Sequence, residues 1–187
     1  MVQAINLKKG MIFSQDGKLI KVLKANHHKP GKGNTVMQMD LRDVKSGAVV
    51  HKTMRPTEKV DLVEVTKKNA QYLYNDGSSY VFMDTSTYDQ LAIPNEQIGD
   101  ESKYLLENMV VSVIMHDGET LGIQLPNTVD LKVAKTEPNI KGDTSSGGGK
   151  PATMETGLVV NVPFFINEGD VLTINTSDGT YVSRANK

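Results

Sequence analysis

Four Asp-Gly dipeptides constrain the fold of this 187-residue chain more than any other feature of its sequence. They stand at Asp16-Gly17, Asp76-Gly77, Asp117-Gly118 and Asp178-Gly179, each beside segments rich in Val, Ile, Leu and Tyr. Such dipeptides accept the positive φ angles that tight hairpin turns require. The neighbouring segments are therefore predicted to be strands of small antiparallel sheets or barrels. These segments are residues 18–23, 80–83, 109–115, 121–125 and 158–162.

Helical patterns are scarce. The best candidate is residues 100–108, where Asp100 can cap the N-terminus and Lys103 and Glu107 are spaced i,i+4. A second helical turn is predicted after Pro94. One short helix within a five-strand pattern is typical of a small Greek-key barrel of the OB type, by analogy of pattern.

Charge changes sign near residues 65–68, and the Pro126-Asn127-Thr128 turn separates residues 121–125 from residues 129–134, so we place module boundaries at about residues 65 and 127. Residues 1–65 carry 12 Lys/Arg against 6 Asp/Glu (+6), residues 66–127 carry 3 against 9 (−6), and residues 128–187 carry 6 against 7 (−1). We name these the first, middle and third modules. Modules of this size lie near the lower limit for an independent core, and three of them in series leave little room for a deep catalytic cleft.

Composition narrows the chemistry. The chain has no Cys, which excludes disulfides, thiolate zinc sites, iron–sulfur clusters and Cys nucleophiles, and which suits a reducing compartment. The N-terminal residues lack the apolar core of a signal peptide, and no run approaches the roughly 18 apolar residues that span a bilayer. We expect a cytoplasmic monomer without a membrane partner.

The strongest local feature is a basic stretch without acidic residues between Asp16 and Asp40. Its basic and histidine residues are Lys18, Lys21, Lys24, His27, His28, Lys29 and Lys32. Two extended runs, residues 19–28 and 35–41, are predicted to flank a loop centred on Pro30-Gly31-Lys32-Gly33. The ring of Pro30 fixes its own φ, and we expect Gly31 and Gly33, on either side of Lys32, to adopt φ values that other residues avoid. The Lys32 ammonium would then lie at the tip of a hairpin. It could be a solvated turn lysine, a polyanion contact, or a lysine presented to a modifying enzyme or an RNA crevice.

Other motifs carry little. His27 and His28 are adjacent on a predicted strand and point to opposite faces, so they cannot chelate one ion together, and we expect no metal site. Gly147-Gly148-Gly149-Lys150 departs twice from the Walker pattern, and no carboxylate pair stands out, so we expect neither a cofactor nor an enzyme. Four aromatic residues of the middle module have even residue numbers, so within each predicted strand they lie on one face of the sheet. Aromatic residues on one face of a small barrel usually form its core, which we favour over a surface for base stacking. They are Tyr72, Tyr74, Tyr80 and Phe82.

Several motifs in the same order resemble bacterial elongation factor P over essentially the whole chain. The first is the Lys29-Pro30-Gly31-Lys32-Gly33 tip on a basic N-terminal β module. The second begins at Lys150-Pro151-Ala152 and continues with Gly157, Val160, Val162-Pro163, Ile166 and Gly169. Gly142-Asp143-Thr144 and Tyr181-Val182-Ser183-Arg184 are also similar to that family.

The resemblance implies an all-β fold, with an SH3-like (KOW-type) first domain and two OB-type domains arranged like a tRNA. It implies a translation factor that binds the ribosome between the peptidyl and exit sites and promotes peptide bonds at stalled polyproline stretches. Lys32 matches the tip lysine that reaches toward peptidyl-tRNA and is commonly extended by a modifying enzyme, here of unknown identity. Relatives carry lysylation, an aminopentanol group or no modification, and this sequence does not choose among them.

Site residues follow from the same resemblance, position by position. The tRNA-binding candidates are Lys29, Pro30, Gly31, Lys32, Gly33, Asn34, Arg42 and Arg55. The candidates for ribosome and messenger contacts are Gly142, Asp143, Thr144, Tyr181 and Arg184. The alternative is a general RNA-binding or RNA-chaperone β barrel, because basic β barrels commonly serve that role.

Overall fold

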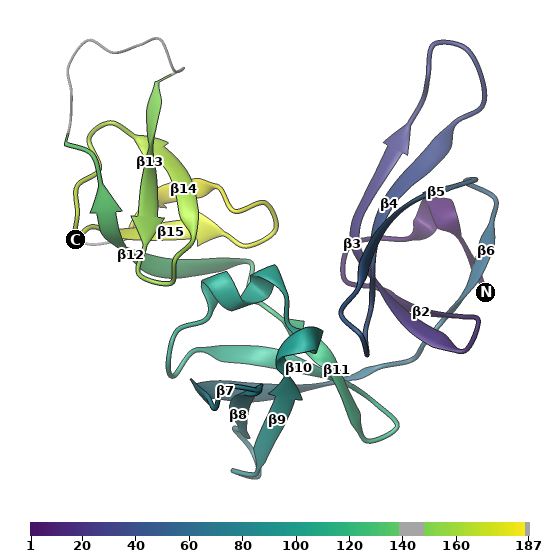
Figure 1. Cartoon of the computed structure of the whole chain (residues 1–187), viewed down its shortest axis with the longest axis horizontal. Helices are drawn as coiled ribbons and strands as arrows, with labels where there is room; N and C mark the ends of the chain where they lie inside the picture. The colour runs from purple at the N-terminus through teal and green to yellow at the C-terminus, as the bar shows by residue number, and fades with distance from the viewer. Residues whose placement is uncertain (139–147, 186–187) are drawn as a thin grey trace. The chain divides into compact units, whose positions relative to one another are not determined.

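The computed structural model describes residues 1–138 and 148–185, and the strands within them form three antiparallel sheets (Figure 1). The predicted all-β class with little helix is confirmed, because the helices of the described residues are short 3-10 turns. No helix in the described part of the chain has the length and apolar character needed to cross a membrane.

The first sheet has six strands in the order β1-β6-β2-β3-β4-β5. They are β1 (Val2–Gln3), β2 (Ile12–Gln15), β3 (Lys18–His28), β4 (Val36–Asp43), β5 (Val49–Met54) and β6 (Lys59–Leu62), with the 3-10 turn η1 (Ala4–Asn6) after β1. Its core gathers around Phe13, Val22, Met39 and Met54, none more than 1% exposed.

The middle sheet has five strands in the order β11-β10-β7-β8-β9. They are β7 (Thr66–Asn75), β8 (Ser79–Asp84), β9 (Gln90–Pro94), β10 (Val110–His116) and β11 (Glu119–Gln124). Two 3-10 turns, η2 (Asn95–Gln97) and η3 (Asp100–Tyr104), lie between β9 and β10.

The third sheet has the order β14-β13-β12-β15-β16. Its strands are β12 (Thr128–Thr136), β13 (Gly149–Met154), β14 (Val159–Pro163), β15 (Val171–Asn175) and β16 (Tyr181–Arg184). Alternate residues of β12 (Val129, Leu131 and Val133) are buried, and they pack with Leu172 and Ile174 of β15 into one core.

All four Asp-Gly dipeptides lie in the turns of antiparallel hairpins, as predicted. Asp16 and Gly17 have φ values of 53° and 77°, and Asp117 and Gly118 have 50° and 80°, so both residues of each pair are left-handed. Two consecutive left-handed residues match the twist of the flanking strands. Turn chemistry alone therefore located these hairpins.

The helix predicted over residues 100–108 is wrong in extent and type. The structure has only the 3-10 turn η3, which ends at Tyr104, and Asn108 is left-handed (φ 71°).

Packing divides the chain into two compact units that do not follow the sheets. One comprises Met1–Gly99 with Ser112–Gln124, and the other comprises Asp100–Val111 with Leu125–Lys187. The segment 100–111 belongs to the second unit because Tyr104, Leu106 and Met109 pack in the core of the third sheet. The predicted boundaries at residues 65 and 127 separate the sheets, but neither of them separates the two units.

Candidate functional site

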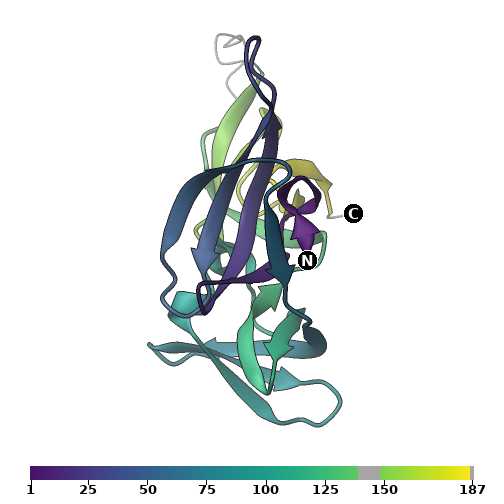
Figure 2. The same cartoon turned by 90° about the vertical axis from the view of Figure 1, so that its right-hand side faces the viewer.

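The basic loop joins the two longest strands of the first sheet. β3 and β4 pair from Ile20 opposite Asp43 to His28 opposite Val36, and residues 29–35 close the hairpin. The hairpin extends beyond the rest of the first module in both views (Figures 1 and 2). Because paired strands restrain each other along this length, the loop has a rigid support on both sides.

Lys32 lies exposed in this loop, between two exposed glycines. Gly33 has φ 113°, a conformation that glycine adopts without steric cost. The expectation that both glycines relax φ is wrong for Gly31, which is not in the left-handed region. A Cβ built on Gly31 would meet no heavy atom within 4 Å, and one on Gly33 would meet only the Pro30 ring, at 3.9 Å. The loop therefore presents Lys32 to an incoming partner without side-chain bulk beside it.

The two arginines predicted to contact tRNA lie at opposite ends of the first sheet. Met37 pairs with His27 on one side and with Met54 on the other, at the end of the sheet where the loop lies. Arg55 directly follows Met54. Arg55 is exposed there, on the same side as the loop. Arg42 is only 6% exposed, and a Cβ added at Gly99 would overlap its guanidinium group. The charged group of Arg42 is therefore covered by the protein itself, and its contact with tRNA stays a prediction.

The candidates in the third module are divided between surface, core and undescribed residues. Arg184 is exposed, and its Cζ lies 5.0 Å from the centroid of the Phe165 ring, which is 49% exposed. Tyr181 is half-buried and packs against the core. Gly142, Asp143 and Thr144 lie outside the described residues. Sequence reasoning missed Phe165, because its residue spacing from Arg184 does not reveal the contact.

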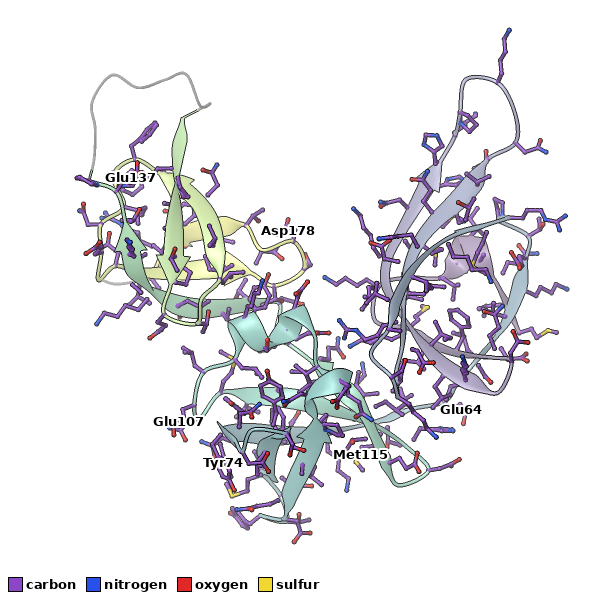
Figure 3. The ribbon with its side chains drawn as sticks, viewed as in Figure 1. Glu64, Tyr74, Glu107, Met115, Glu137 and Asp178 are labelled. Atoms are coloured by element: carbon purple, nitrogen blue, oxygen red, sulfur yellow. The ribbon has the colours of Figure 1, made fainter. Side chains whose placement is uncertain are left out.

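The aromatic face predicted for the middle module is interrupted by a β-bulge. Tyr72 pairs with Phe82, but a register shift brings Tyr74 opposite Val81 instead. Since paired residues share a face, Tyr72 and Tyr74 point to opposite faces of the sheet. Phe82 is fully buried, whereas Tyr74, labelled in Figure 3, is 49% exposed. The core assignment is confirmed for Phe82 and wrong for Tyr74.

Within residues 1–138 and 148–185, no three His, Asp or Glu side chains gather as a metal site would require. His27 and His28 pair with successive residues of β4, Met37 and Val36, and so lie on opposite faces as expected.

Three family profiles match consecutive parts of the chain. Residues 3–60 match "Elongation factor P (EF-P) KOW-like domain", residues 65–123 match "Elongation factor P (EF-P) OB domain", and residues 129–184 match "Elongation factor P, C-terminal". These matches fit the order of the three sheets and the SH3-like and OB-type architecture predicted from the sequence.

Curated relatives agree with the profiles over the full length. Elongation factor P 1 of Lactobacillus acidophilus is 73% identical over 187 residues, covering 100% of this chain and 98% of the relative. Elongation factor P of Enterococcus faecalis is 55% identical, covering 99% of this chain and 100% of the relative. A solved structure of eukaryotic translation initiation factor 5A from Methanococcus jannaschii has 25% identity and a TM-score of 0.40, covering 66% of this chain and 93% of that one. The profiles and the full-length relatives establish that this chain belongs to the elongation factor P family of translation elongation factors.

Proposed function

We propose that this protein binds the ribosome between the peptidyl and exit sites and stimulates peptide bond formation at stalled polyproline stretches. In this proposal the first module lies beside peptidyl-tRNA, and the Lys32 side chain reaches toward its acceptor end. A role in translation elongation and an interaction with the ribosome follow from the family. The binding position, the stalled substrate and the use of Lys32 are the proposed steps.

The observation that carries the proposal is the exposure of Lys32 at the end of the β3–β4 hairpin. The loop residues Lys29, Gly31, Gly33 and Asn34 are exposed as well, and Pro30 is half-buried. No acidic residue interrupts the sequence between Asp16 and Asp40, and the β3 arm that leads to the tip carries the exposed Lys18 and Lys24. A positive tip on a narrow, rigid support suits entry beside a polyanion such as tRNA.

The mechanism we propose is catalysis by positioning. A prolyl nucleophile is a sterically constrained secondary amine, and a nascent chain ending in prolines can draw peptidyl-tRNA away from the attack geometry. A factor that holds the tRNA end in place restores a near-attack arrangement, and orientation alone can lower a barrier by several kcal/mol, up to about 10. No acid or base from this chain is needed, since the ribosome forms the bond.

We further propose that a lysine-modifying enzyme extends Lys32. The bare backbone at Gly31 and Gly33 leaves room for an enzyme to approach the ammonium from either side. Intact-protein mass spectrometry of protein from its own host, with peptide mapping, would locate an added mass on Lys32. An added mass on a different lysine would contradict this part of the proposal.

Contacts with the small subunit and the messenger are proposed for the third module. Arg184 and Phe165 supply a guanidinium group that lies over an aromatic ring, and these two kinds of group hold RNA phosphates and bases. Tyr181 supports this region from the core side. Gly142, Asp143 and Thr144 are included on the family resemblance alone.

The test is Lys32→Ala, with Lys59→Ala as the matched control. Lys59 is an exposed lysine of the same module on β6, so both variants remove one surface charge from it. We expect both variants to keep the wild-type Tm, because neither side chain is buried. Only Lys32→Ala should lose the acceleration of Pro-Pro bond formation in a reconstituted translation assay. If Lys32→Ala relieved stalling fully, the function assigned to the tip would be wrong.

A further inference from the structure

Two cations of the first module are buried at the end of the hairpin farthest from the tip. Lys21 on β3 and Arg42 on β4 are direct cross-strand partners, and each is only 6% exposed. Paired residues share a face, so two like charges lie side by side in a poorly hydrated place. Such an arrangement is unfavourable unless other groups compensate it.

Backbone groups of the middle module lie against both cations. The Lys21 ammonium donates a 3.2 Å hydrogen bond to the carbonyl oxygen of Ile123 on β11. A Cβ added at the neighbouring Gly122 would lie 3.8 Å from the same ammonium nitrogen. The Arg42 guanidinium packs so closely on Gly99 that a side chain there would overlap it. The charged groups of Lys21 and Arg42 therefore both contact the backbone of the middle module.

Further contacts surround this pair. A Cβ built on Gly47, in the β4–β5 turn, would lie 2.7 Å from the carbonyl oxygen of Glu96. The ring Nδ1 of His116 lies 2.8 Å from the carbonyl oxygen of Glu64, which Figure 3 labels. An apolar cluster crosses the same boundary: Ile12, Val44, Ile114 and Leu121, with Leu19, Val63 and Val65 packed on it. The buried apolar area holds the first and middle modules together, and the directional hydrogen bond of Lys21 fixes the orientation of one module relative to the other.

We propose that Lys21 and Arg42 are positioning residues, which lock the first module onto the middle module and thereby set the place of Lys32. This inference rests on the proposed function, since it assigns a purpose to holding the tip still. The first sheet and the middle sheet, apart from Val110 and Val111 of β10, fall in one compact unit. The two basic residues act through the hairpin and not by touching RNA.

The length of the hairpin makes the orientation of its base matter. From Lys21 to His28 the strand advances seven residues, or about 23 Å at roughly 3.3 Å per residue, so a tilt of about 5° at the base moves the tip by about 2 Å. In catalysis by positioning, a misplacement of about 1 Å can reduce a rate about 100-fold. A loosened base would therefore harm the reaction although Lys32 itself is unchanged.

The kinetic test compares Lys21→Ala with Lys59→Ala in the Pro-Pro bond assay, using the full chain and a titration of the factor. We expect Lys21→Ala to lower the rate at saturating factor at least about 10-fold, with little change in the half-saturating concentration, because the surfaces that bind are retained. Lys59→Ala should behave as wild type. The double variant Lys21→Ala/Lys32→Ala should have the same rate as Lys32→Ala alone. Once the Lys32 side chain is removed, a change in the orientation of the hairpin has nothing left to misplace.

The structural test uses residual dipolar couplings of the wild-type chain. One alignment tensor should fit the amides of the first and middle sheets together, and Lys21→Ala should require two. Gly99→Ala disturbs the same contact from the middle module, and it replaces Lys21→Ala in both tests if that variant does not fold.

Each outcome is decisive. Two tensors in the wild type, or a wild-type rate for Lys21→Ala or Gly99→Ala where Lys32→Ala has lost activity, would overturn the inference. If instead Lys32→Ala remained fully active, the proposed function would fail, and the dipolar couplings would still decide whether Lys21 and Arg42 hold the two modules together.

Discussion

Tyr104 lies against Gly179, and a Cβ on that glycine would stand 2.9 Å from the phenolic oxygen. Tyr104 ends η3, whereas Gly179 belongs to the Asp178-Gly179 turn between β15 and β16, where Figure 3 labels Asp178. The phenol is 9% exposed and belongs to the core of the third sheet. This contact binds a segment of the chain that precedes β10 to the last hairpin.

Tyr104 predicts a loss of stability at alkaline pH. Burial, together with Asp100, Asp178 and Glu101, raises the pKa of Tyr104 above its ordinary value of 10.0. The unfolded chain then ionises first, so this stabilisation is complete below pH 10 and is lost as the pH rises through the raised pKa. We expect the Tm of the wild type to fall more steeply above about pH 10 than that of Tyr104→Phe. Parallel pH profiles would contradict this prediction.

The two loop glycines should respond oppositely to alanine. Gly33→Ala forces a side chain into φ 113° and should destabilise the first module by about 1 kcal/mol. Gly31→Ala has open space and no positive φ, so it should be neutral or stabilise by up to about 1 kcal/mol through the unfolded state. Urea denaturation of both variants measures the difference. Equal effects would show that the loop backbone differs from the one described.

Arg42 and Arg55 should separate stability from binding. Arg42→Ala should destabilise the fold by about 2 kcal/mol or more, because it leaves a cavity where the buried guanidinium packs on Gly99. Arg55→Ala removes an exposed side chain and should leave the Tm unchanged while weakening ribosome affinity. Calorimetry and ribosome binding on the same two preparations test both statements. A Tm loss confined to Arg55→Ala would reverse the assignment.

Salt dependence should distinguish a ribosomal factor from a general RNA chaperone. The middle module, with 9 acids against 3 Lys/Arg, should repel free RNA, so isolated tRNA and random single strands should bind weakly. Assembled ribosomes carrying peptidyl-tRNA should bind much more tightly in the same buffer. Filter binding at several salt concentrations checks this. Similar, steeply salt-dependent affinity for every RNA would favour the chaperone alternative.

Local features of this fold could be read from the sequence, because their causes lie within a few residues. The Asp-Gly turns depend on which residues tolerate a given φ, and sequence reveals that directly; in the β3–β4 loop the same reasoning holds for Gly33 and fails for Gly31. The bulge between Tyr72 and Tyr74 depends on how β7 pairs with β8, so a count of alternating positions placed Tyr74 on the wrong face.

Burial of charge could not be read in the same way. Lys21 and Arg42 look like the other basic residues of the first module, and only the approach of β11 and Gly99 reveals that they are covered. Nor could the sequence assign residues 100–111 to the third module, because their partners on the third sheet follow later in the chain. Long-range packing therefore determined which of the predicted contacts remain on the surface.

The division of the chain into two interleaved units has a consequence for its own synthesis. The chain changes units at residues 99/100, 111/112 and 124/125. During translation the first unit cannot close until β11 has left the exit tunnel, by which time residues 100–111 have already emerged without their partners. The apolar side chains of Tyr104 and its neighbours then stay exposed to water until the C-terminal hairpins have been synthesised. Nascent chains that stop between Gln124 and the C-terminal strands should therefore be the ones that chaperones and proteases recognise.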